Sequence, residues 1–171
     1  MTLLDDVRTL LESPTMNGKD VRTLLRLDHD EALQIARDMV ESEGVDERRA
    51  LLRQLKPALV AHSRAEEREV YEPLAKLLQS ESARDIAHEG MVEHELLDDL
   101  LERLSKSRKT ETGEWKAYAK VLLELLAHHI DEEHARMFEE IGRHFSEAQR
   151  EAMGRRFLAA KARCAPRVRA A

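Results

Sequence analysis

The chain has 171 residues, enough for one domain with a sizeable core, and only 4% of them are aromatic. Charged residues make up 36%, which favours long amphipathic helices over a sheet built from β-branched and aromatic residues. The net charge of -6 is mild and indicates little beyond solubility. The lone Cys164 excludes an internal disulfide and fits a reducing cytosol.

The N-terminus, MTLLDDVRTLLES, carries acidic residues where a signal peptide has a basic region and an apolar run. No apolar stretch approaches the roughly 18 residues that span a bilayer. We therefore expect a cytoplasmic protein without a membrane partner.

Apolar residues recur at helical spacing along most of the chain. They predict an all-α fold, an up-down-up-down four-helix bundle with a short N-terminal segment and an additional C-terminal helix. The expected segments are a short helix at Leu3–Leu11, four long helices at 19–42, 46–78, 82–106 and 114–144, and a C-terminal helix at 146–162. The whole chain, 1–171, is expected to be a single domain, with its core bundle at 19–144.

Several local signals refine this prediction. Pro57 and Pro73 lie inside the second long helix and predict a bend at each, since proline removes one backbone hydrogen bond. Ser146 and Gln149 have the spacing of a capping box at the start of the last helix. DVRTLL occurs twice, at Asp6–Leu11 and Asp20–Leu25, and the sequence assigns no role to this duplication.

The C-terminal region is basic and holds no acid after Glu151. We expect it to be solvated rather than to bind nucleic acid, because no recognised nucleic-acid motif accompanies it. Its cations are Arg155, Arg156, Lys161, Arg163, Arg167 and Arg169.

Two segments carry the chemistry, AHSRAEEREVYEPL from Ala61 and HHIDEEHARMFEEI from His128. Each contains a His-x-x-x-Glu pair, His62 with Glu66 and His129 with Glu133. Residues four apart lie on the same face of a helix, so each imidazole and its carboxylate point the same way. Imidazole with carboxylate suits a first-row transition metal such as iron.

The other two long helices each offer one histidine on an otherwise apolar stripe. His29 precedes His62 by 33 residues, and His94 precedes His129 by 35 residues. The chain is therefore an internal duplication of a helix with one His followed by a helix with HisxxxGlu. Six potential ligands in two matching sets predict a binuclear metal site inside the bundle.

The pattern H…HxxxE…H…HxxxE resembles that of the hemerythrin-like, or HHE cation-binding, family, over about Lys19 to Ile141. The resemblance implies a four-helix bundle with a non-haem di-iron centre, completed by an oxo or hydroxo bridge. By position, His29 and His62 would bind one iron, His94 and His129 the other, and Glu66 and Glu133 would bridge them. Each iron would then keep one open position.

One position departs from the oxygen-carrying hemerythrins, which have another His one turn before the third-helix His. Here that position is Gly90. We consider two explanations, close packing of the third helix on a neighbour and space for an exogenous ligand beside the metal. A ferritin-type site would need Glu-x-x-His, which the chain lacks. The remaining histidines, His88, His128, His134 and His144, have no partner in the other repeat and are expected at the surface.

Open positions on two redox metals imply a small diatomic or peroxide ligand. The first interpretation is a protein that binds or reduces O2, H2O2 or NO in oxidative or nitrosative stress protection. The alternatives are reversible O2 binding or sensing and, with less support, iron storage. Whether the protein is an enzyme, its electron donor, its physiological ligand and its oligomeric state are not determined by the sequence.

Overall fold

The computed structural model of this protein describes residues 18–107 and 112–164. Its elements are α2 (Val21–Glu41), α3 (Val45–Glu66), η1 (Glu67–Tyr71), α4 (Glu72–Ala75), α5 (Glu81–Lys106), α6 (Gly113–Glu132), η2 (Glu133–Met137), α7 (Phe138–His144) and α8 (Glu147–Cys164). The all-α prediction is confirmed. The short N-terminal helix, the first DVRTLL copy and the last two arginines lie outside the described residues.

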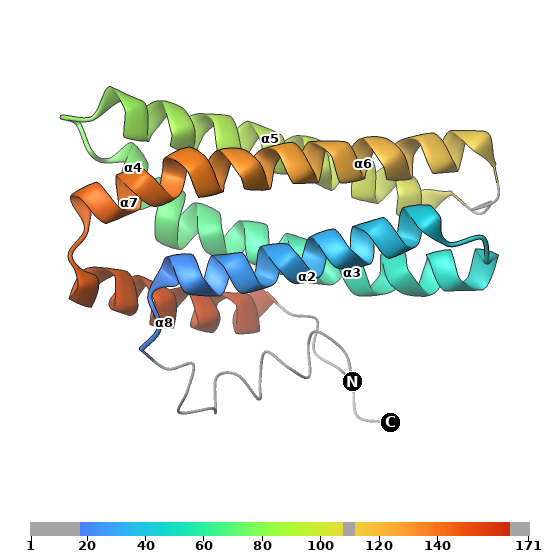
Figure 1. Cartoon of the computed structure of the whole chain (residues 1–171), viewed down its shortest axis with the longest axis horizontal. Coiled ribbons are helices and arrows are strands. Elements are labelled where there is room, and N and C mark those ends of the chain that lie inside the picture. Colours follow the sequence, from blue (N-terminus) through green and yellow to red (C-terminus); the bar gives the residue numbers. More distant parts are fainter. Residues whose placement is uncertain (1–17, 108–111, 165–171) are drawn as a thin grey trace.

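Four long rods form the bundle, and the chain runs up and down through them in order (Figure 1). The first rod is α2, the second is α3 with η1 and α4, the third is α5, and the fourth is α6 with η2 and α7. Contacts join α2 to α3 and α6, and α5 to α6 and α3, so neighbours along the chain are neighbours in space. The additional helix, α8, packs along α2 and α3 outside this bundle (Figure 1).

Side-chain caps fix where several helices begin. Asp20 accepts a hydrogen bond from the backbone N–H of Arg22 (3.0 Å), and Ser80 accepts one from Ala83 (3.2 Å). The predicted capping box is present, because Ser146 N–H donates to Gln149 Oε1 (2.8 Å) and Gln149 N–H donates to Ser146 Oγ (3.4 Å). These bonds satisfy N–H groups that have no partner within the helix.

A π-helical turn interrupts the second and fourth rods immediately after each His-x-x-x-Glu pair. In η1 the N–H of Glu72 donates to the carbonyl of Glu67, and in η2 that of Phe138 donates to Glu133, five residues back in both cases. Pro73 follows η1 in the first turn of α4, where its missing N–H costs nothing. Pro57 lies within α3, which continues through it.

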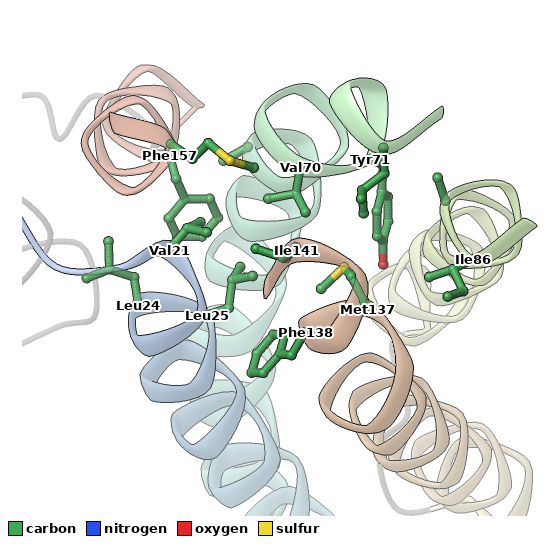
Figure 2. Close-up of a cluster of buried hydrophobic side chains, with 14 of the residues drawn as sticks. Val21, Leu24, Leu25, Val70, Tyr71, Ile86, Met137, Phe138, Ile141 and Phe157 are labelled. Carbon is green, nitrogen blue, oxygen red and sulfur yellow. The ribbon is translucent and has the colours of Figure 1, made fainter. Parts of the chain in front are cut away.

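The core consists of two apolar clusters at opposite ends of the bundle. One contains Val21, Leu25, Tyr71, Phe138 and Phe157 among its members (Figure 2), and the other is built around Trp115. Along each rod the predicted ligand lies between the residues of the two clusters. The polar residues therefore form a layer between two apolar ones. Among the described residues, no helix has the length and apolar character needed to cross a membrane.

Candidate metal centre

The bundle brings together the six residues predicted from the sequence, and all six are buried. His29 Nε2 lies 3.1 Å from His62 Nε2, and His94 Nε2 lies 3.2 Å from His129 Nε2. The four rings therefore present the same nitrogen to the centre of the bundle, in two pairs. Each pair joins a histidine from one helix with the histidine of the next helix in the chain.

Two glutamates connect the pairs. Glu66 Oε2 lies 3.3 Å from His62 Nε2 and 3.5 Å from His94 Nε2. Glu133 places Oε2 3.2 Å from His29 Nε2 and Oε1 3.5 Å from His129 Nε2. Each carboxylate thus lies between one imidazole of the first pair and one of the second, the arrangement that bridging ligands have.

Three oxygens of these glutamates are buried and accept no hydrogen bond from the described residues: Glu66 Oε1, Glu66 Oε2 and Glu133 Oε2. A buried carboxylate oxygen without a donor is costly, and a bound cation removes that cost. The donor set of four imidazole nitrogens and two carboxylates also matches first-row transition metals. The residues present therefore fit a binuclear metal centre.

Burial and mutual repulsion perturb the acid–base properties of the cluster. Burial and the Glu66 carboxylate raise the pKa of Glu133 to about 7. Burial opposes a charge on His62, but Glu66 and Asp28 outweigh it and raise the pKa of His62 to about 10. In the same way, Glu66 and Glu67 outweigh burial and raise the pKa of His94 to about 9. A cation that enters the cluster must displace these protons.

Three of the four histidines contact a carboxylate through Nδ1, the ring nitrogen that points away from the centre of the cluster. Asp28 Oδ2 lies 3.0 Å from His62 Nδ1, Glu67 Oε1 lies 3.1 Å from His94 Nδ1, and Glu93 Oε2 lies 2.7 Å from His129 Nδ1. If Nε2 of each ring bound a metal, Nδ1 would carry the proton and donate a hydrogen bond to the carboxylate. Sequence reasoning missed these three acids, although each is next to a predicted ligand in the sequence.

His134 completes this outer ring and corrects one prediction. Its Nε2 lies 3.0 Å from His29 Nδ1, so it is a half-buried partner of a predicted ligand rather than a surface residue. His88 and His128 are exposed as expected. His144 is half-buried and lies 3.1 Å from Glu140 Oε2.

Tyr71 occupies the space beside Gly90. A Cβ atom at Gly90 would lie 2.3 Å from the Tyr71 hydroxyl oxygen, so the glycine accommodates this ring. The hydroxyl donates a hydrogen bond to Glu133 Oε1, and burial together with the Glu133 and Glu66 charges raises the pKa of Tyr71 well above its usual value. The prediction that Gly90 leaves space for an exogenous ligand is therefore wrong, and its alternative of close packing is confirmed.

Lys161 of α8 corrects a second prediction, because it is buried rather than solvated. Its Nζ donates a hydrogen bond to Asp28 Oδ2, the same atom that faces His62. Lys161 and His62 together outweigh burial and lower the pKa of Asp28 to about 2. Phe157, one turn earlier on α8, lies edge-on to His62 with ring centroids 5.6 Å apart. The C-terminal helix is thus part of the environment of the site.

A cavity adjoins the four histidines on the side away from Tyr71. It offers about 20 Å³ to the centres of water-sized molecules, roughly enough for one of them. Ala32, Ala58, Leu59 and Leu126 form its apolar walls, and Asp28 and Lys161 are its other charged or polar lining residues beside the histidines. This is the space that a small ligand of the centre would occupy.

Comparison with known proteins agrees with this geometry. No curated protein and no solved structure matches the chain significantly. The sequence profile described as the hemerythrin HHE cation binding domain matches residues 20–141. That match runs from the cap of α2 to Ile141 within α7 and contains all six residues of the buried cluster, and over this length the chain belongs to the hemerythrin HHE cation-binding domain family.

Proposed function

We propose that this protein holds two iron ions in the buried cluster and binds or reduces small oxidants there. His29 and His62 would bind one ion, His94 and His129 the other, and Glu66 and Glu133 would bridge them. The observation that carries the proposal is the pair of buried glutamates, each between two imidazole nitrogens, with three oxygens that accept no hydrogen bond from the described residues.

The donor set favours iron over other common metals. Four imidazoles and two bridging carboxylates suit iron or manganese, whereas structural zinc sites typically hold one ion in a closed set of four ligands. Two adjacent redox ions supply electrons to a bound oxidant, and this is the chemistry that the centre would contribute. The protein residues do the rest by binding the ions, orienting them and limiting the access of water.

The cavity supports a ligand of very few atoms. Its volume of about 20 Å³ suits O2, NO or H2O2 better than larger substrates. The apolar side chains of Ala32, Leu59 and Leu126 give bulk water little to bind, which limits uncontrolled protonation near the histidines. We infer that size selects the ligand more than specific hydrogen bonds do.

Tyr71 supports the position of one proposed bridging carboxylate. Its hydroxyl donates a hydrogen bond to Glu133 Oε1, and it does not line the cavity that adjoins the histidines. The raised pKa of Tyr71 keeps this hydroxyl protonated at neutral pH, so it remains a hydrogen-bond donor to Glu133. This contact is compatible with reduction of an oxidant and with its reversible binding, and the second experiment below separates the two.

The first experiment is the metal content and optical spectrum of the protein purified in air. We expect two irons per chain and the near-ultraviolet charge-transfer bands of a bridged di-iron centre. The second experiment separates the two functions by adding H2O2 to the iron-loaded protein. Multiple turnovers support a redox enzyme, whereas an O2-dependent spectrum that persists in air and disappears under vacuum supports a carrier. A protein that binds no iron at either pair of histidines contradicts the proposal.

A further inference from the structure

The two halves of the site have different surroundings, although their inner ligands match. The duplication places Asp28 and Glu93 one residue before His29 and His94, and each accepts from the histidine of the following helix. It places Glu67 and His134 one residue after the bridging Glu66 and Glu133. At this last position a carboxylate in one half corresponds to an imidazole in the other.

In the His94/His129 half, the Nδ1 atom of each histidine contacts a carboxylate. Glu67 Oε1 faces His94 at 3.1 Å, and Glu93 Oε2 faces His129 at 2.7 Å. The cation nearest to Glu67 is Arg64, at 2.6 Å, but its side chain is 41% exposed and it also bonds Asp98. Glu93 has only the exposed His128 at 3.7 Å in addition to its ligand histidine. The carboxylate charges on this side are therefore largely uncompensated.

In the His29/His62 half, the groups that contact the Nδ1 atoms of the histidines, together with their own partners, carry almost no net charge. His29 Nδ1 faces the imidazole of His134 at 3.0 Å. His62 Nδ1 faces Asp28, but the Lys161 ammonium, only 6% exposed, bonds the same Asp28 oxygen. A buried cation is screened far less by water than the exposed Arg64, so it offsets the Asp28 charge more fully.

We propose that the two metal positions are inequivalent, and that His134 and Lys161 make the His29/His62 position the weaker-binding and more readily reduced one. A carboxylate that accepts a hydrogen bond from Nδ1 of a ligand imidazole raises the basicity of that imidazole and its affinity for the metal. Fewer negative charges near a metal ion favour its lower oxidation state. The first ferrous ion to bind therefore fills the His94/His129 position. His134 and Lys161 act here as positioning residues, since each reaches a metal only through a ligand histidine or its carboxylate. The inference depends on the proposed iron centre and adds an order of filling to it.

Reciprocal substitutions test this directly. His134→Glu puts a carboxylate behind His29, where Arg26 Nη1, now 3.4 Å from the ring of His134, can pair with it as Arg64 pairs with Glu67. Glu67→His introduces the imidazole into the other half. His88→Glu is the matched control, because it makes the same change of residue at an exposed position of α5 that is neither a proposed ligand nor one of the groups in contact with a ligand histidine.

The measurement is anaerobic titration with ⁵⁷Fe(II) in competition with a chromogenic ferrous chelator, with Mössbauer spectra at one and two equivalents. Wild type should show two dissociation constants at least about tenfold apart and two distinct quadrupole doublets, since outer partners change metal affinity by roughly 10- to 100-fold. His134→Glu should tighten the weaker constant by about tenfold and make the doublets more alike. Glu67→His should weaken the stronger constant, and His88→Glu should change neither.

The outcomes separate this inference from the proposed function. If wild type binds two ferrous ions with one dissociation constant, the inference is wrong and the iron centre stands. The same conclusion follows if His134→Glu and Glu67→His both bind two ions with constants within twofold of wild type. If wild type binds no ferrous ion, both the inference and the proposed function fail. Circular dichroism of each variant verifies that the helices are intact.

Discussion

His62 tests the inner ligand set at the scale of single residues. His62→Ala removes one imidazole and leaves Asp28 Oδ2 and Glu66 Oε2 without that partner. We expect at least one of the two irons to be lost, with a fall in the free energy of unfolding of about 1–3 kcal/mol. The control is His128→Ala, because His128 lies about 100° around the helix from the proposed ligand His129. The His128→Ala protein should bind two irons. Elemental analysis decides, and two irons in His62→Ala would contradict the assignment.

Gly90 and Tyr71 make a second prediction at this scale. An alanine Cβ at position 90 would lie 2.4 Å from Tyr71 Cζ, and the ring is fully buried and unable to swing into solvent. Gly90→Ala should therefore lower the free energy of unfolding by about 1–3 kcal/mol, in spite of the helix propensity that alanine adds. Urea denaturation measures this difference.

The control removes the ring that causes the clash. In a Tyr71→Leu background, Gly90→Ala should cost much less, because the shorter side chain leaves room for the added methyl group. Strictly additive losses in the double variant would show that the two residues do not interact and that the packing explanation of Gly90 is wrong.

The sequence predicted the six buried His and Glu residues but not the groups that contact the histidines through Nδ1, for a physical reason. His62 and Glu66 share a helix face, so their proximity follows from helical geometry alone. The contact between Asp28 and His62 depends on how two helices cross, and the contact between Asp28 and Lys161 depends on where α8 docks. The periodicity of residues within one helix predicts neither the crossing of two helices nor the docking position of α8. The symmetry of the repeat was a usable signal, since Asp28 and Glu93 occupy matching positions.

At the scale of elements, helix positions were predicted well and the π-helical turns were not. An i to i−5 hydrogen bond leaves no periodic trace in eight or ten residues of sequence. Proline is not its common cause, because η2 has the same turn although the residue that corresponds to Pro73 is Glu140. One turn begins directly after Glu66 and the other begins at Glu133, the two glutamates of the buried cluster. We infer that the duplicated ligand geometry, rather than proline, maintains them.

Asp20 links α2 to α8 and yields a pH-dependent prediction. Its carboxylate caps α2 and bonds Arg22 and the α8 residue Arg150, at 2.7 Å each, and these bonds outweigh partial burial and lower the pKa of Asp20 to about 2. A folded pKa below the unfolded value stabilises the protein above about pH 4, and the stabilisation disappears as the pH falls towards 2. Asp20→Asn keeps a capping oxygen and loses the charge.

We expect Asp20→Asn to be less stable than wild type by about 1 kcal/mol at pH 7, after allowance for solvent screening of this partly exposed group. The difference should shrink between pH 4 and pH 2, where wild type loses the same charge. Chemical denaturation at pH 7 and pH 3 followed by circular dichroism measures both values. A difference that is constant over this range would show that the ion pairs with Arg22 and Arg150 contribute nothing.

At the scale of the whole molecule, the bundle places a polar layer between two apolar clusters. Four imidazoles and two carboxylates are buried there, and such groups destabilise a fold unless each finds a partner. Apolar clusters lie at either end of this layer, and the one that includes Phe157 of α8 is drawn in Figure 2. Metal binding and folding are therefore expected to be coupled, with the metal-loaded form the more stable one.

This coupling also involves protons. The pKa of His62 is raised to about 10 and that of His94 to about 9. In the metal-free protein at pH 7, both rings are therefore in the charged imidazolium form, with both nitrogens protonated. A metal needs the neutral imidazole and the ionised carboxylate. Binding at pH 7 should therefore release roughly two protons from these rings and a fraction of one from Glu133, whose pKa is raised to about 7. The apparent affinity should fall as the pH falls. Titration calorimetry with Fe(II) in two buffers of different ionisation enthalpy measures the number released. Equal heats in the two buffers would mean that no net proton leaves, and that the carboxylates Glu66, Glu67 and Asp28 do not hold these histidines in the charged form before the metal arrives.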